Sequence, residues 1–581
     1  MRAASKPGWI EREGRPLLAL SLVLVVLLAA LPIVRLVLAA LGGDPPGQGF
    51  ARLIGVALAD RTLSALGETL LIAALSGAAA ILLGGALALT LALTDVAHKR
   101  LLAFLIVMSL MVAPQVAALA FKALAGPGSP LLNALGLAPP LGTPNPMLSR
   151  GGIVLVMALH HAPLAAIAIA AGLASVPRAV IEAATSDGAR PLALTRHIVL
   201  PMIRPHIAGA CVLVAIAGFG NFGIPALLGL PVNIVTLPTL VYQSLASFGP
   251  TIIPDAARLA VVMALVAGLG VAASSLLARH SPEPLEPGEA MLPVCRLGVW
   301  RWPLTGLVWI AVVVMLLLPS AALLASALVP AYGMTLTLET ATLSRFVEVL
   351  LRQSVTSRAL VNSLLLAGTA ALLLAALTPL VAYALTRAGR RWITPALAIA
   401  ELTYALPGIV IAIAAILLFL KPLPLIGISL YATPAIILAA YLMRFFALAL
   451  KPALAAMSLV DRAQEEAAAI AGAGLCSRLA YIVLPTLAPA AAAGGMMVFL
   501  LAFNELTVSA LLYSAGTETL GVALLSLDDA GLGAEAAAVG VVATLIVAAI
   551  MIVLDRLAPW LPPGVLPWVV LAGAAPTSAR R

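Results

Sequence analysis

Two copies of one spaced motif carry the most specific chemical signal in this sequence. Each copy reads Glu-Ala-Ala, three residues, Gly, nine residues and Ile-x-Leu-Pro, and the second copy lies 284 residues after the first. Small side chains let another protein approach closely, and the glutamate offers a charge to recognise. The motif predicts protein docking rather than catalysis. Its residues are Glu182, Ala183, Ala184, Gly188, Ile198, Leu200 and Pro201, then Glu466, Ala467, Ala468, Gly472, Ile482, Leu484 and Pro485.

Each motif predicts a short helix, a turn and a second short helix, over 176–203 and 460–487. Pro177 suits a first helical turn, and Asp461 begins a capping-box pattern. A glycine ends each first helix because it can adopt a left-handed conformation. We expect Pro201 and Pro485 to end the second helices. A plain hairpin is the alternative, because each glutamate follows an arginine by four residues and could pair with it.

No set of residues in the sequence predicts catalysis. The chain has no Gly-Lys dipeptide, so it lacks a phosphate-binding P-loop. The adjacent His160 and His161 point to different faces of a helix, and the three cysteines match no metal or disulfide pattern. We expect no catalytic residue, no metal site and no cofactor in this chain.

The composition places these motifs in a membrane protein. Hydrophobic residues make up 62% of 581, charged residues 10%, and the mean hydropathy is +1.12. Soluble proteins are about 25% charged. The net charge of +9 lies mostly in short loops, which excludes a nucleic-acid partner as its explanation. About 20 apolar residues span a bilayer, and twelve segments qualify. They lie near 16–40, 66–93, 101–124, 152–175, 204–228, 256–278, 303–329, 360–386, 393–420, 429–456, 486–512 and 534–556.

Basic residues set the expected orientation. Loops that carry them, such as the one with Lys99 and Arg100, fall on the side of the N-terminus. By the positive-inside rule, both termini and both motifs are cytoplasmic. The exceptions are Arg345, Arg352 and Arg358, which fall outside in a longer loop.

The chain is predicted to be an all-α membrane protein of two parallel six-helix repeats. Both halves start on the same side, so a membrane-normal axis relates them. A Pro- and Glu-rich stretch separates them. The predicted divisions are 1–280, a linker at 281–300, 301–558, and a surface tail at 559–581.

A few polar residues inside the predicted spans are candidates for a central path, because polar groups in lipid are costly. Helix–helix hydrogen bonding is the structural alternative. The candidates are Gln115, Asn221, Glu401, Tyr404, Asn504 and Glu505. We expect Arg444 and Lys451 to extend toward the membrane surface.

The two motifs resemble the "EAA" loops of permease subunits of binding-protein-dependent ABC importers. The resemblance implies a multi-pass protein of the bacterial inner membrane, whose loops dock on a separate homodimeric ATPase that holds ATP and Mg²⁺. It also implies a periplasmic binding protein that delivers substrate, and a lipid surround. Glu182, Gly188, Glu466 and Gly472 would be the coupling residues.

Two halves in one chain, and the run from Asn221 to Gly229, resemble the ferric-iron permeases, with thiamine and aminoalkylphosphonate permeases as relatives. Ferric iron is therefore the expected substrate, and the other two are alternatives. An ion-coupled secondary transporter is an alternative of another class, although Thr94–Arg100 lacks the glycines such proteins carry between helices two and three. A membrane enzyme is the third.

Overall fold

The computed structural model describes residues 14–42, 48–140, 142–245, 252–278, 295–331, 333–422, 427–560 and 566–573. Within these ranges the chain is helical, and extended pairing is limited to one isolated bridge between Thr94 and Cys295. Residues 279–294, which include most of the predicted linker at 281–300, lie outside the described residues, as do parts of the predicted tail.

The helices before the linker begin and end as follows: α2 (Arg15–Val25), η1 (Val26–Ala30), α3 (Leu31–Leu41), α4 (Gly49–Ala57), α5 (Asp60–Leu93), α6 (Lys99–Met111), α7 (Pro114–Ala125), α8 (Pro130–Ala134), α9 (Arg150–Leu173), α10 (Arg178–Ser186), α11 (Pro191–Leu194), η2 (Thr195–Val199), α12 (Leu200–Phe219), α13 (Gly223–Leu228), η3 (Leu230–Val232), α14 (Leu237–Leu245) and α15 (Ile252–Ala278).

Those after the linker are η4 (Gly298–Trp300), α16 (Arg301–Val312), η5 (Val313–Leu317), α17 (Leu318–Leu328), α18 (Ser344–Val347), η6 (Glu348–Arg352), α19 (Ser354–Ala388), α20 (Arg390–Ala405), α21 (Gly408–Phe419), α22 (Pro434–Ala456), η7 (Met457–Leu459), α23 (Arg462–Ile470), α24 (Leu475–Arg478), η8 (Leu479–Val483), α25 (Leu484–Phe503), α26 (Ser509–Leu512), α27 (Leu520–Asp529), α28 (Gly533–Leu557), η9 (Ala558–Trp560) and α29 (Pro567–Leu571).

Ten helices in the described ranges are long and apolar enough to cross a membrane, or up to twelve if two bent pairs are counted as spans. The bent pairs coincide with the predicted third span of each half, near 101–124 and 393–420. The chain turns by 99° between α6 and α7 and by 106° between α20 and α21. The cause is local, because Pro114 and Pro407 each follow an extended residue, as the residue before a proline prefers.

Helix bounds recur in the two halves at the offset of the motif. Helices α10, α11, η2 and α12 each correspond, residue for residue, to α23, α24, η8 and α25 when 284 is added. A side-chain contact recurs as well. The Leu237 amide donates to Thr69 Oγ1, and the Leu520 amide donates to Ser363 Oγ, both at 2.7 Å. Helices α5 and α19 therefore correspond at an offset of 294.

The prolines of the motif do not end helices, contrary to expectation. Helices α11, η2 and α12 form one continuous span over Pro191–Phe219, and Leu475–Phe503 does the same. A five-residue π turn, η2 or η8, ends two residues before Pro201 or Pro485. A proline ring clashes with the carbonyl four residues earlier, and the wider π turn accommodates it. Helices η1 and η5 precede Pro32 and Pro319 in the same way.

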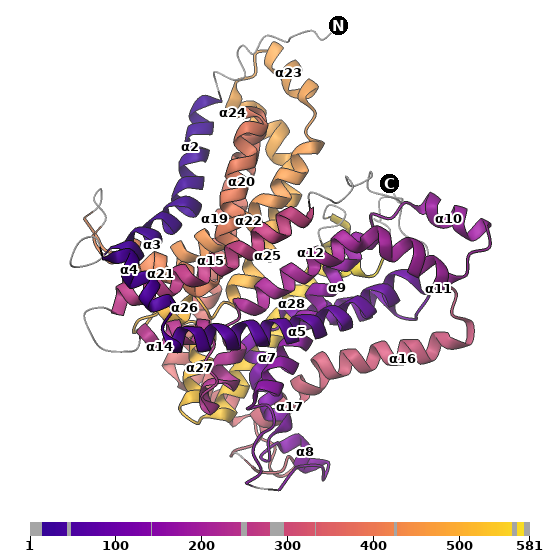
Figure 1. Ribbon diagram of the computed structural model, residues 1–581, viewed down its shortest axis with the longest axis vertical. Coiled ribbons are helices and arrows are strands. Elements are labelled where there is room, and N and C mark those ends of the chain that lie inside the picture. Colours follow the sequence, from indigo (N-terminus) through magenta and orange to yellow (C-terminus); the bar gives the residue numbers. More distant parts are fainter. Residues whose placement is uncertain are drawn as a thin grey trace.

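The first span of each half packs against the other half. Helices α2 and α3 contact α19, α20 and α21, and α17 contacts α7 and α8. Figure 1 shows two groups of helices that diverge, with α23 at the end of one and α10 at the end of the other. The groups meet around α21, which contacts α14 and α15 of the first half and α26 of the second.

The chain after the last span is buried where it is described, so the predicted surface tail is wrong for 566–573. Helix α29 packs against α6 and α9 of the first half. Trp568 and Leu571 are fully buried, and the Trp568 ring meets the edge of Phe104 at 5.6 Å. Trp568 Nε1 donates to Asp555 Oδ1, which also pairs with Arg100. A short apolar stretch interrupted by prolines does not indicate in the sequence that it packs against another part of the chain.

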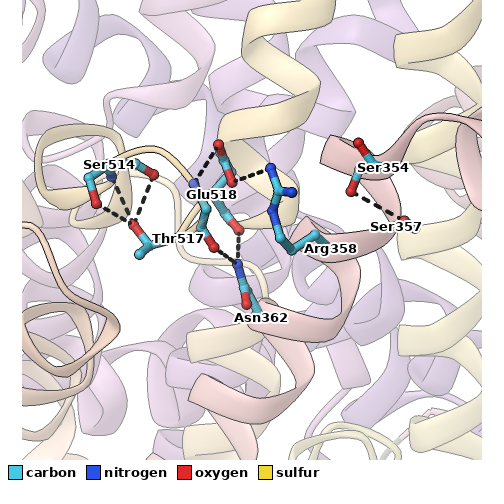
Figure 2. A network of polar contacts seen from close by, with 8 residues as sticks. Ser354, Ser357, Arg358, Asn362, Ser514, Thr517 and Glu518 are labelled. Atoms are coloured by element: carbon cyan, nitrogen blue, oxygen red, sulfur yellow. Dashed lines mark hydrogen bonds and ion pairs between the residues drawn. The ribbon is translucent and has the colours of Figure 1, made fainter.

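The arginines that violate the charge rule are neutralised by carboxylates. Arg345 pairs with Glu535 at 2.7 Å, and Arg352 pairs with Glu348 at 3.7 Å. Figure 2 shows the third, in which Arg358 pairs with Glu518 at 3.5 Å. Beside it, Asn362 Nδ2 donates to the carbonyls of Gly516 and Glu518 and ties their loop to α19.

Candidate functional site

Two exposed helical hairpins contain the repeated motif. The first hairpin is 178–194 (α10 and α11), and the second is 462–478 (α23 and α24). Gly188 and Gly472 have φ angles of +83° and +88°, so each turn needs a residue that tolerates the left-handed region. The residue after each glycine donates its amide to a carbonyl five residues earlier, and this closes the turn. The predicted helix–turn–helix is present in both halves.

The motif residues divide into an exposed tip and a half-buried base. Glu182, Ala183 and Gly188 are exposed, as are Glu466, Ala467 and Gly472, whereas Ala184 and Ala468 are half-buried. The Ile-x-Leu-Pro residues lie beyond the hairpins, at the start of the continuous spans. Of these, Pro485 is exposed and the others are half-buried: Ile198, Leu200, Pro201, Ile482 and Leu484.

The two glutamates differ in their partners. Glu182 Oε1 lies 2.6 Å from Arg178 Nε, so the intrahelical pair holds in the first copy. Both side chains are exposed, and such a pair contributes about 0.5 kcal/mol or less. Glu466 has no ion pair within the described part of the chain. Asp461 caps α23 as expected, accepting from the Ala463 amide at 2.9 Å.

Each hairpin also exposes apolar side chains that the motif does not include. Leu192 is 80% exposed in the first hairpin; Ile470 (85%) lies in the second, and Tyr481 (82%) just beyond it. These positions lie on projecting hairpins, where single exposed apolar residues together with alanines form a surface that a protein partner can cover. Sequence reasoning missed them because it followed the motif alone.

The second hairpin is held to its membrane helix by a buried polar network. The Glu465 side chain is 2% exposed and forms an ion pair with Arg387 of α19. The Tyr383 hydroxyl donates to the other carboxylate oxygen at 2.9 Å. Arg478 is 1% exposed and lies close enough to Tyr383 to act on it electrostatically. The network joins α19, α23 and α24.

The first hairpin has apolar residues at all four equivalent positions. Leu89 and Leu93 correspond to Tyr383 and Arg387 at the offset of 294, and Ile181 and Leu194 correspond to Glu465 and Arg478 at 284. Leu93, Ile181 and Leu194 are buried. Equivalent hairpins are thus positioned by ions in one half and by apolar packing in the other.

A second polar cluster lies where the bent helices meet the ends of α12 and α25. Gln115, just after the first break, donates to the Asn504 carbonyl at 3.2 Å. Asn504 Nδ2 in turn donates to the Met111 carbonyl, just before that break, at 2.8 Å. The two predicted path residues therefore connect the halves by hydrogen bonds.

Asn221 and Glu505, 284 residues apart, cap short helices in the same way. Asn221 Oδ1 accepts from the Ile224 amide, and Glu505 Oε1 accepts from the Val508 amide, both at 3.1 Å. Glu505 has a further partner, because its Oε2 lies 3.3 Å from Arg444 Nε. Both residues are buried, so each has a structural role whether or not it also faces a path.

Arg444 does not extend to the membrane surface as expected. Its side chain is 21% exposed, and a Cβ on Gly408 would lie 1.8 Å from Nη1, so the guanidinium packs where the second break leaves room. That Nη1 atom is buried without a hydrogen-bond partner. Tyr404, before this break, is 37% exposed. Glu401 pairs instead with Lys451 at 2.9 Å, away from this ion pair.

The two histidines are adjacent in α9 and both are buried. Their rings meet edge to face at 5.4 Å. Across the described residues, no three His, Cys, Asp or Glu side chains gather closely enough to hold a metal ion. His160 occupies the position equivalent to Arg444. The break in the second half thus has an arginine–glutamate ion pair where the first half has His160 and Asn221.

Comparison with known proteins agrees with this architecture. Residues 377–567 match the family model of the binding-protein-dependent transport system inner membrane component. A probable ABC transporter permease protein of Sinorhizobium fredii is 28% identical over 401 residues, which is 67% of this chain and 68% of that protein. The ferric transport system permease protein of Actinobacillus pleuropneumoniae is 23% identical over 421 residues, 70% of this chain and 58% of that protein.

A protein of Salmonella choleraesuis named for 2-aminoethylphosphonate transport is 35% identical over 97 residues, 17% of this chain and 37% of that protein. The chain thus spans less than two thirds of the ferric and phosphonate relatives. The matched family segment contains the second hairpin, α25 and Glu505. The resemblance predicted from the repeated motif is confirmed: residues 377–567 match the family of binding-protein-dependent inner-membrane transport components, and about two thirds of the chain is similar to permease proteins of such systems.

Proposed function

We propose that this chain is the membrane channel of an ATP-driven importer and that its two hairpins dock a homodimeric ATPase, one subunit on each. The partner would hold ATP and Mg²⁺, since this chain has no P-loop. A periplasmic binding protein would deliver the substrate to the opposite side. In this orientation both termini and both hairpins are cytoplasmic, and the divisions are 1–280, 281–300, 301–558 and 559–581.

The observation that carries this proposal is the pair of hairpins. They have the same bounds at one offset, the same left-handed glycine, and exposed alanines and glutamates at their tips. A symmetric dimer presents two identical surfaces, and two matched hairpins suit it. The hairpins lie at the ends of diverging helix groups (Figure 1), so closure of the partner would draw those groups together.

Ferric iron is the proposed substrate. The support is that 70% of this chain is similar to a protein that is named for ferric transport. Gln115, Asn221, Tyr404, Asn504 and Glu505, near the helix breaks, are the proposed path residues. Glu401 is a weaker candidate because Lys451 neutralises it.

An aminoalkylphosphonate is the second candidate, and one observation favours it. Arg444 has a buried Nη1 atom without a partner at the second break, and a guanidinium fork suits a phosphonate. Thiamine remains a third candidate from the likeness of the whole chain. An ion-coupled secondary transporter is the competing class, and it would not require an ATPase.

Docking is tested by copurification of the cognate ATPase with the full chain. The test variant is Glu182→Ala with Glu466→Ala, and the control is Glu339→Ala, an exposed glutamate outside the hairpins and the proposed path. We expect the ATPase to copurify with the wild type and with the control. The amount that copurifies with the double variant should be at least tenfold lower. Equal recovery in all three would contradict docking at the hairpins.

A further inference from the structure

An apolar groove opens on the membrane-spanning part of the first half. It has a volume of about 310 Å³, which falls within the roughly 300–1,000 Å³ of small-molecule sites. Its walls are α5, α9 and α16, all within candidate spans. Figure 1 shows α16 beside α5 of the first half, and α16 extends away from the other helices of the second half. Residues that line it include Leu83, Leu87, Thr90, Leu159, Leu304 and Ala311.

One end of the groove lies beside cationic side chains. Thr90 and Leu304 are one turn from the loop that contains Asp95 and from Arg301. The loop and α16 are joined, because the Ala97 amide donates to Thr305 Oγ1 at 3.1 Å. Lys99 and Arg301 both act electrostatically on Asp95, so both cations lie near this carboxylate.

The charge balance at this end is positive. The Leu297 amide donates to Asp95 at 2.8 Å and, with Arg301 and Lys99, holds the pKa of that carboxyl below its usual range. Asp95 is therefore ionised and offsets one of the two cations. Arg100 adds no free charge, since Asp555 neutralises it. Lys99, Arg301 and Asp95 together leave one net positive charge about one helical turn from the lining residues Thr90 and Leu304.

Two exposed tryptophans place this end at the level of lipid headgroups. Trp300 and Trp302 flank Arg301 and are 73% and 66% exposed. Tryptophan concentrates at the membrane–water interface, where its ring meets both environments. A lipid whose acyl chain follows the groove would thus have its phosphate beside Lys99 and Arg301.

We propose that this groove binds one anionic phospholipid, with an acyl chain along α5, α9 and α16 and the phosphate held by Lys99 and Arg301. The concave wall gives the chain more contacts than a flat lipid-facing helix does. The two cations select for a headgroup with net negative charge over a zwitterionic one. The bound lipid fills the space between α16 and the first half.

The test uses the full chain purified from nanodiscs that contain equal amounts of phosphatidylglycerol and phosphatidylethanolamine. Native mass spectrometry of the released protein counts the lipids that remain bound. We expect one phosphatidylglycerol to persist on the wild type. Lys99→Gln with Arg301→Gln should reduce its retention about thirtyfold, because each cation near the surface contributes about fivefold.

A second variant removes the space rather than the charge. Ala311→Trp fills the groove and should abolish retention, while Leu372→Trp, at a 73% exposed site on α19, should leave it unchanged. Lys421→Gln is the control for charge. Equal retention of the two lipids by the wild type would overturn the proposal, as would unchanged retention in either the cation variant or Ala311→Trp. Lipid retention does not depend on ATPase docking, so a failure of the lipid proposal can be distinguished from a failure of the proposed function.

Discussion

The two hairpins have the same backbone and opposite means of attachment. In the second half, Glu465 is buried against Arg387 and Tyr383, whereas the first half has Ile181 at the position of that glutamate. The helix breaks differ in the same way, because the second half has the ion pair of Arg444 and Glu505 where the first half has His160 and Asn221. Equivalent buried positions of this fold therefore accept either apolar side chains or polar side chains that are paired with each other.

Ionic attachment should be more sensitive to single changes than apolar attachment. Removing one member of a buried pair leaves an uncompensated charge, at a cost of about 3–5 kcal/mol. Shortening a buried apolar side chain costs about 2–5 kcal/mol and varies with how well the site collapses. The network also fixes direction through its hydrogen bonds, so the second hairpin should be the more rigidly oriented.

The largest effect is expected from Glu465→Ala. The change leaves Arg387 buried without its carboxylate, and we expect about 3–5 kcal/mol of lost stability, localised to α23. Hydrogen exchange of the amides of Arg462–Ile470 measures it. Glu466→Ala, at the exposed neighbouring position, is the matched control and should change exchange by less than about 0.5 kcal/mol. Similar exchange in both variants would contradict the network.

A somewhat smaller effect is expected at the second break. Glu505→Asn removes the carboxylate from Arg444, but Arg444 keeps 21% exposure, so we expect a loss of about 2–3 kcal/mol. Adding Arg444→His recreates the pair found in the first half and should restore most of the loss. Thermal unfolding in detergent compares the two variants. A double variant less stable than Glu505→Asn alone would show that the halves are not interchangeable here.

Replacing the whole network should have little effect on stability. Tyr383→Leu, Arg387→Leu, Glu465→Ile and Arg478→Leu together give the second half the residues of the first. Because apolar packing often replaces a buried ion network without loss, we expect stability within about 1 kcal/mol of the wild type. Thermal unfolding of this variant beside Glu465→Ala is the measurement. If the variant with four substitutions were less stable than Glu465→Ala, the claim that apolar side chains can replace the polar network would be wrong.

The smallest effect is expected from Glu182→Ala in the first hairpin. Its partner Arg178 is exposed, so the pair contributes about 0.5 kcal/mol or less. Thermal unfolding should barely change, whereas ATPase docking should weaken. A large loss of stability would assign this glutamate a structural role.

The repeated motif predicted the hairpins and their glycine turns, and the length of the apolar runs predicted most of the spans. Local chemistry determines these features, because glycine permits the left-handed turn and apolar length determines a span. The bends at Pro114 and Pro407 were missed because a proline in an apolar run predicts either a kink or a break. The continuous helices through Pro201 and Pro485 were missed because a π turn leaves no clear mark in the sequence.

Contacts between distant segments could not be predicted. Glu465 stands beside the motif glutamate and carries no signal that it is buried, since its partner Arg387 lies in a different span. Arg444 is paired rather than extended to the surface because Gly408, on another helix, leaves space for it. Trp568 is buried because α6 and α9 of the other half receive it.

The most direct test of the central claim is substrate uptake by proteoliposomes that contain this chain, its cognate ATPase and its binding protein. Ferric ion, an aminoalkylphosphonate and thiamine are supplied in turn, with and without ATP, to the wild type and to Glu182→Ala with Glu466→Ala. We expect uptake of one substrate, and this uptake should require ATP and be lost in the double variant while the chain stays folded. Uptake without ATP, or full ATP-dependent uptake by the double variant, would contradict it.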